Sequence, residues 1–63
     1  MKQYLVVYFS KVGDIQGIEQ SFITLPYELN LKTIRYAELK LRRLFDVKKI
    51  IILAFKEINS KEN

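Results

Sequence analysis

Hydrophobic and polar positions along the first half of the chain predict two strands joined by a loop. Residues 3–10 are dominated by β-branched and aromatic side chains, which favour a strand. Residues 11–17 contain two glycines and an aspartate, a composition typical of a hairpin loop. Residues 18–25 form a second strand with polar and apolar side chains on both faces, a content that suits a half-exposed sheet edge, and Pro26 ends this strand because proline has no N–H to donate.

The first of these strands is apolar on both faces. Successive side chains of a strand point to opposite sides of the sheet. The strand is therefore predicted to lie in the middle of the sheet, with both of its faces covered. Its two alternating sets are Leu5, Val7 and Phe9 on one face and Tyr4, Val6 and Tyr8 on the other.

A helix is predicted from Asn30 to about Asp46. Asn30 is a favourable N-cap residue because its side chain can accept a hydrogen bond from an unpaired backbone N–H. Leu29 and Ile34 have the spacing of a hydrophobic staple. The stripe that faces the core is predicted to consist of Ile34, Ala37, Leu41, Leu44 and Phe45.

Residues 48–58 predict a third strand. Three consecutive isoleucines lie in the apolar run from Ile50 to Phe55, and β-branched residues favour a strand over a helix. Residues 59–63 are polar and are expected to fray. The chain is thus predicted to form one domain over residues 1–58.

The element order ββαβ predicts an α+β fold, in which a three-stranded antiparallel sheet of order 2-1-3 carries one helix on one face. One helix can cover only one face of such a sheet. If the helix covers Leu5, Val7 and Phe9, the other face of the first strand is exposed. An exposed apolar face on so small a domain predicts an interface, and we expect a homodimer. The residues assigned to this open face and dimer contact are Tyr4, Val6 and Tyr8.

The chain contains neither cysteine nor histidine. Disulfides are therefore excluded, zinc lacks its usual ligands, and the commonest general base and the best nucleophile are absent. Asp14 and Glu19 are a nearby acidic pair, but an aspartate in a turn is ordinarily there for the turn rather than for a metal ion. No phosphate-binding glycine pattern occurs. We expect a protein that is not an enzyme, with no metal site and no cofactor.

Neither a membrane span nor a secretion signal is predicted. The longest apolar run, residues 50–55, is far too short to cross a bilayer. The apolar run at residues 5–9 is short for a signal-peptide core, and no small-residue cleavage site follows it. The absence of cysteine agrees with a reducing compartment, so a cytoplasmic location is expected.

The net charge of +4 is concentrated in residues 29–50, which hold seven basic and two acidic residues. A basic helix of this kind can face an acidic protein or nucleic acid, or can simply keep an apolar chain soluble. Tyrosine and arginine are favoured anchors of protein interfaces, and arginine beside an aromatic side chain also suits phosphates and bases. The outer face predicted from the helical spacing contains Arg35, Tyr36, Leu39, Lys40, Arg42 and Arg43.

The layout of the chain resembles that of small proteins encoded by phages and prophages of Gram-positive bacteria. The resemblance lies in the pattern Lys2-x-Tyr4-x-Val6-x-Tyr8, a glycine-containing hairpin, a helix near residues 30–45 and a closing isoleucine-rich strand. It implies a cytoplasmic protein of the bacterial host cell that binds a host factor, including defence proteins, and redirects or inhibits it.

These observations predict a small protein-interaction module with a protein partner, expected to be a modulator or inhibitor of a bacterial host protein. The alternative is an accessory protein that binds nucleic acid through the basic helix. No helix-turn-helix, RRM or KH pattern accompanies that helix.

Overall fold

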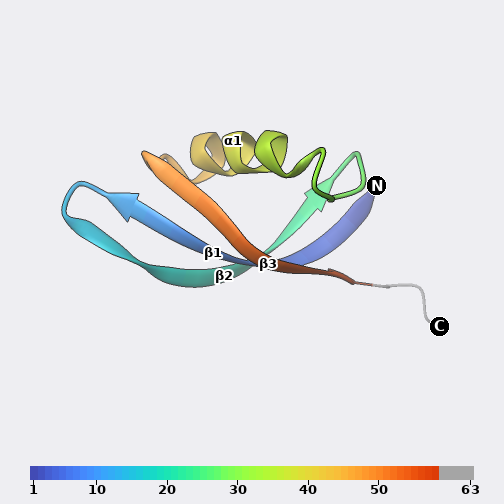
Figure 1. The fold of residues 1–63 in the computed structure, drawn as a ribbon, viewed down its shortest axis with the longest axis horizontal. Coiled ribbons are helices and arrows are strands. Elements are labelled where there is room, and N and C mark those ends of the chain that lie inside the picture. Colours follow the sequence, from blue (N-terminus) through green and yellow to red (C-terminus); the bar gives the residue numbers. More distant parts are fainter. Residues whose placement is uncertain (59–63) are drawn as a thin grey trace.

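The computed structural model describes residues 1–58, and the tail expected to fray, residues 59–63, lies outside the described residues. The elements are β1 (Lys2–Val12), β2 (Ile15–Leu25), α1 (Ile34–Phe45) and β3 (Lys49–Ile58). The strands form one antiparallel sheet of order β2-β1-β3, and α1 lies over one side of it (Figure 1). The predicted ββαβ fold of the α+β class is confirmed.

The hairpin between β1 and β2 is tighter than the loop expected at residues 11–17. Val12 stands opposite Ile15, so only Gly13 and Asp14 form the turn. Gly13 has φ +61°, in the left-handed region that glycine enters without steric cost. A glycine with positive φ at the first central position suits a two-residue hairpin turn of type II′, and this turn lets both strands continue to its edge.

The helix covers the face of β1 that was predicted to be open. Tyr4, Val6 and Tyr8 are buried, so their assignment to the open face is wrong. Both tyrosines are accommodated beneath the helix because their hydroxyls find partners there. The Leu29 N–H donates to the Tyr4 hydroxyl at 2.8 Å, and the Tyr8 hydroxyl lies 3.1 Å from the Ser21 hydroxyl.

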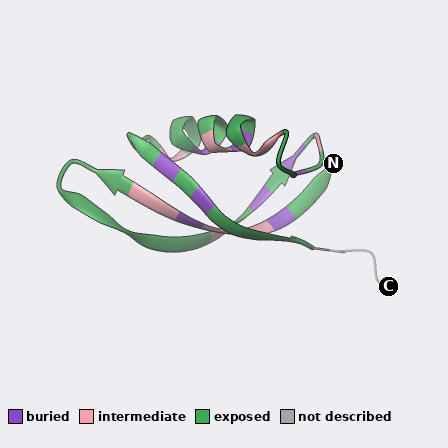
Figure 2. Ribbon diagram, viewed as in Figure 1, coloured by how far each residue is buried: buried purple, intermediate pink, exposed green. Residues whose placement is uncertain are grey.

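The core lies between α1 and the parts of the sheet beneath it, as the buried segments of Figure 2 show. The tyrosine rings extend it through aromatic contacts. Tyr4 meets Phe55 edge-on at 6.1 Å between ring centroids, and Tyr8 stacks on Phe45 at 5.6 Å. Such pairs add to the stabilisation from burial alone. The buried core residues are Tyr4, Val6, Tyr8, Ile23, Leu25, Leu29, Ala37, Leu41, Ile50 and Ile52.

A β-bulge in β3 changes which of its residues face the helix. Tyr8 stands opposite Ile52, whereas Val7 stands opposite Ala54, so Leu53 is an extra residue without a partner in β1. Ile50 and Ile52 are buried before the bulge, and Phe55 turns back toward Tyr4 after it. A strict alternation along β3 therefore could not have assigned both halves of the strand to the correct face.

The chain begins to turn at Asn30, but α1 begins only at Ile34. The Asn30 side chain accepts hydrogen bonds from the N–H groups of Lys32 and Thr33, so it does satisfy unpaired donors as expected. It stabilises the turn before the helix, however, and Thr33 occupies the N-cap position without a side-chain cap. The predicted end is confirmed, because Asp46 adopts a left-handed conformation (φ 55°) directly after Phe45.

The helix axis lies nearest to β3. The carboxylate of Glu38 accepts a hydrogen bond from the Ile52 N–H at 3.0 Å and thereby ties the helix to this edge strand. Ala37 and Leu41 are buried, and Ile34 and Phe45 pack against the core, as the helical stripe predicted. Leu44 is 64% exposed and does not belong to the stripe. Leu44 lies on the flank of the helix that faces away from β3, and no strand lies close enough to cover this flank.

Candidate interaction surfaces

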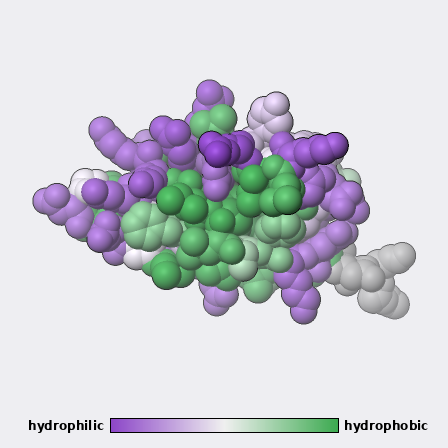
Figure 3. All heavy atoms as spheres, in the orientation of Figure 1, coloured by the Kyte–Doolittle hydropathy of each residue, from purple (hydrophilic) through white to green (hydrophobic). Residues whose placement is uncertain are grey.

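The uncovered side of the sheet carries an apolar surface, which we call the open sheet face. On β1, Leu5, Val7 and Phe9 are half-buried. Strand pairing places the apolar side chains of β2 and β3 beside them. Figure 3 views the molecule from the side of β3, with α1 above the sheet, and hydrophobic side chains gather over the middle of β3 there. The open sheet face consists of Leu5, Val7, Phe9, Ile18, Phe22, Ile51 and Ala54.

The most exposed members of this face come from β2. Phe22 stands opposite Leu5 and is 68% exposed, and Ile18 stands opposite Phe9 and is 66% exposed. Neither residue was predicted from the sequence to belong to an interface. The signal was present, because Ile18 and Phe22 lie four residues apart on one face of a strand that Pro26 ends.

The charged side chains of the open sheet face are lysines. Lys11 and Lys49 stand opposite each other at one end of the strands, and Lys56 stands opposite Leu5 toward the other end. The strand glutamates, Glu19 and Glu57, stand opposite Tyr8 and Tyr4 and therefore belong to the side of the helix. The middle of the face is thus mainly apolar, interrupted on β2 by Gln20 opposite Val7, and its cations lie at its ends.

All six residues predicted for the outer face of the helix are exposed. Arg35, Leu39 and Arg42 lie beside β3, where they line a hollow together with Glu38 and Ile50. Tyr36 and Lys40 do not line this hollow.

The hollow beside β3 has a volume of about 220 Å³, and we call it the β3 groove. It continues into a neighbouring hollow of about 290 Å³, with which it shares Leu39 and Arg42. The neighbouring hollow is completed by Arg43, Asp46 and Val47. Together the two hollows form a depression that runs along the exposed side of α1.

The arginines of the β3 groove have no carboxylate partner within residues 1–58. The ion pair found in that part of the chain joins Lys2 to Glu57. Glu38 lies in the groove, but its carboxylate is engaged by the Ile52 N–H. Asp46 contributes the other negative charge at the far end of the depression.

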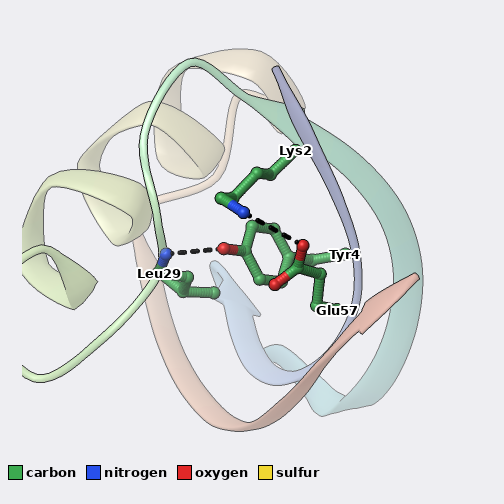
Figure 4. Close-up of polar contacts among 4 residues, drawn as sticks. All are labelled: Lys2, Tyr4, Leu29 and Glu57. Carbon is green, nitrogen blue, oxygen red and sulfur yellow. Dashed lines mark hydrogen bonds and ion pairs between the residues drawn. The ribbon is translucent and has the colours of Figure 1, made fainter. Parts of the chain in front are cut away.

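The Lys2–Glu57 pair closes the end of the sheet above Tyr4 (Figure 4). The Lys2 ammonium donates to the Glu57 carboxylate at 3.2 Å, and both side chains are partly exposed. The hydrogen bond to Glu57 and its negative charge raise the pKa of Lys2. The pair joins β1 to β3 and is separate from both candidate surfaces.

A further hollow of about 300 Å³ lies where the hairpin projects beyond the end of α1. Tyr8, Phe45 and Val47 form its apolar side, and Glu19 is its charged group. No three metal-binding side chains come together among the described residues. Over the same residues, no helix is long and apolar enough to cross a membrane.

Comparison with known proteins found no matching family model, no similar curated protein and no similar solved structure.

Proposed function

We propose that the chain is a small, non-catalytic protein-interaction module and that its open sheet face binds a second copy of the chain. The observation that carries this proposal is the mainly apolar side of the sheet that the helix leaves uncovered, with Ile18 and Phe22 of β2 about two-thirds exposed. Small monomeric domains rarely leave a contiguous apolar surface in water, and thin cores are commonly completed by a second subunit.

The energy of burial is of the size that a dimer needs. Complete burial of an isoleucine or phenylalanine side chain contributes roughly 1.5–3 kcal/mol. In a symmetric dimer each copy contributes Ile18, Phe22 and Ile51, which are 66%, 68% and 40% exposed. Scaled by these exposures, their burial contributes about 5–10 kcal/mol, which lies within the range of the association cost of about 4–15 kcal/mol. The lysines at the ends of the face can keep their ammonium groups in water while their carbon chains cover apolar surface.

Dimerisation through the sheet would leave both copies of α1 exposed on the outside. The helix flanks would then be free to bind another protein. The layout resemblance to small phage and prophage proteins makes a host protein in the bacterial cytoplasm the expected partner, with modulation or inhibition as the result of binding.

Light scattering coupled to size-exclusion chromatography tests the dimer. The wild-type chain is expected to have twice the mass of one chain at micromolar concentration. Phe22→Lys and Ile18→Lys are each expected to yield monomers, because each places a charge at the centre of the contact. Leu44→Lys is the matched control, since Leu44 is similarly exposed (64%) but lies on the helix.

The Leu44→Lys variant is expected to remain a dimer, and far-UV circular dichroism checks that each variant is folded. A wild-type monomer at micromolar concentration would contradict the proposal. If Phe22→Lys and Ile18→Lys both remain dimers, the dimer interface is not the open sheet face.

A further inference from the structure

We infer that the β3 groove binds an acidic segment of a partner protein. In this inference the partner's carboxylates pair with Arg35 and Arg42, and an apolar side chain of the segment packs between Leu39 and Ile50. The inference deepens the proposed function by naming the chemistry of a second partner. It uses a surface on the other side of the molecule from the proposed dimer contact.

Helical spacing assembles one side of the groove. Residues 35, 38, 39 and 42 are separated by three or four positions, so their side chains lie along one flank of α1. The hydrogen bond between Glu38 and the Ile52 N–H holds this flank beside β3. The helix and the edge strand therefore form two walls of one depression.

The groove offers cations above an apolar floor. Ile50 is buried at the base of the groove, whereas Leu39 is about half exposed and lies outside the core. The guanidinium groups of Arg35 and Arg42 lack a carboxylate partner within the described residues. A guanidinium binds a carboxylate with two parallel hydrogen bonds, which gives both affinity and orientation.

The groove fits an acidic peptide better than it fits a nucleic acid strand. Single-stranded nucleic acid is bound by aromatic side chains on which bases stack, but Tyr36 does not line the groove. The carboxylates of Glu38 and Asp46 are also close by and would repel a regular row of phosphates. A peptide can space its acidic residues so that they meet the arginines alone.

Addition of a strand along β3 at Ile52 is disfavoured, because the Ile52 N–H already donates to Glu38. Strand addition relies on free backbone groups at the sheet edge. We therefore infer that the segment is held by its side chains.

Fluorescence anisotropy tests the inference with a short labelled peptide that alternates glutamate and leucine. The same peptide with glutamine in place of glutamate is the uncharged control and should bind much more weakly. The variant that combines Arg35→Glu and Arg42→Glu is expected to lose affinity by about tenfold or more, since it removes two charge-assisted contacts.

The matched control combines Lys32→Glu and Lys40→Glu, which changes the net charge equally but leaves the groove intact. This control is expected to lose less than about threefold, as screened surface charges do. Equal losses in both double variants would show attraction by net charge alone and would overturn the inference. Absence of peptide binding by the wild-type chain at low salt would overturn it too.

A labelled thymidine oligonucleotide distinguishes the other class of partner. Tighter binding of the oligonucleotide than of the peptide, with the same dependence on Arg35 and Arg42, would assign the groove to nucleic acid and overturn the inference. Light scattering distinguishes failure of this inference from failure of the proposed dimer. The variant that combines Arg35→Glu and Arg42→Glu should keep the wild-type mass, because neither arginine lies in the open sheet face.

Discussion

The Tyr4 side chain connects β1 to the segment that precedes α1. Its ring is 1% exposed, and its hydroxyl accepts a hydrogen bond from the Leu29 N–H at 2.8 Å. This contact ties the segment before α1 to the tyrosine face of β1 and satisfies the buried hydroxyl of Tyr4. The strand pattern alone could not reveal it, because both faces of β1 are apolar and Leu29 lies 25 residues away along the chain.

Tyr4→Phe is expected to destabilise the fold by about 1–3 kcal/mol, because it leaves the buried Leu29 N–H without an acceptor. Urea unfolding at neutral pH measures the change in the free energy of unfolding. Tyr36→Phe removes the same hydroxyl from a side chain that is 65% exposed and should have almost no effect. Equal stability of wild type and Tyr4→Phe would show that this hydrogen bond contributes nothing.

The Lys2–Glu57 pair predicts a pH-dependent contribution to stability. Its hydrogen bond and charge raise the pKa of Lys2, so the folded state holds the Lys2 proton more tightly than the unfolded state. The contribution is fully present below the ordinary lysine pKa of about 10.4 and is lost as the pH rises through the higher pKa of the folded state.

Comparison of wild type with Lys2→Met from neutral to strongly alkaline pH checks this expectation. The difference in urea midpoint should be constant at neutral pH and should vanish at the alkaline end. Burial also raises the pKa of Tyr27, but that effect is common to both proteins and cancels in the difference. A difference that persists unchanged at the alkaline end contradicts the assigned role of the pair.

The strands and the helix follow from the hydrophobic pattern, whereas the hairpin turn and the β-bulge do not. The three strands, the helix and its end near Asp46 were predicted from periodicity and side-chain type. The two-residue turn at Gly13 and the bulge at Leu53 depend on strand register, which local composition does not encode. For the same reason a longer hairpin loop was expected.

The hairpin turn predicts different outcomes at the two glycines. Gly13→Ala should cost about 1–2 kcal/mol, because alanine at φ +61° suffers a clash of its Cβ with the backbone. Gly17 has no positive φ, and a Cβ added there would meet nothing within 4 Å, so Gly17→Ala should be neutral or slightly stabilising. Thermal or urea unfolding of both variants provides the comparison. Equal costs at the two positions would argue against the tight turn.

The link between α1 and β3 can be tested at Glu38. Glu38→Ala removes the acceptor of the Ile52 N–H and should cost about 1 kcal/mol, whereas Glu38→Gln keeps an acceptor oxygen and should retain most of the stability. Urea unfolding of the two variants measures the difference. If glutamine and alanine destabilise equally, the hydrogen bond does not hold the helix against the edge strand.

At the scale of the whole molecule, one helix covers one side of the sheet and leaves the other side apolar. That imbalance was predicted from the sequence, since a single helix cannot cover both faces of β1. The identity of the exposed side was not, because it depends on the partners of the Tyr4 and Tyr8 hydroxyls. The exposure of the helix residues was predicted correctly, but the hollow lined by Arg35 and Arg42 depends on the packing of α1 beside β3, which the sequence does not reveal.

Isotope-filtered NOE spectroscopy can show whether the open sheet face binds a second copy of the chain. In a mixture of labelled and unlabelled chains, this experiment detects only contacts between different copies. We predict such contacts among Val7, Ile18, Phe22 and Ile51. Contacts between copies that involve the helix instead of these residues, or no contacts at a concentration where the chain is folded, would show that the open sheet face is not the dimer interface.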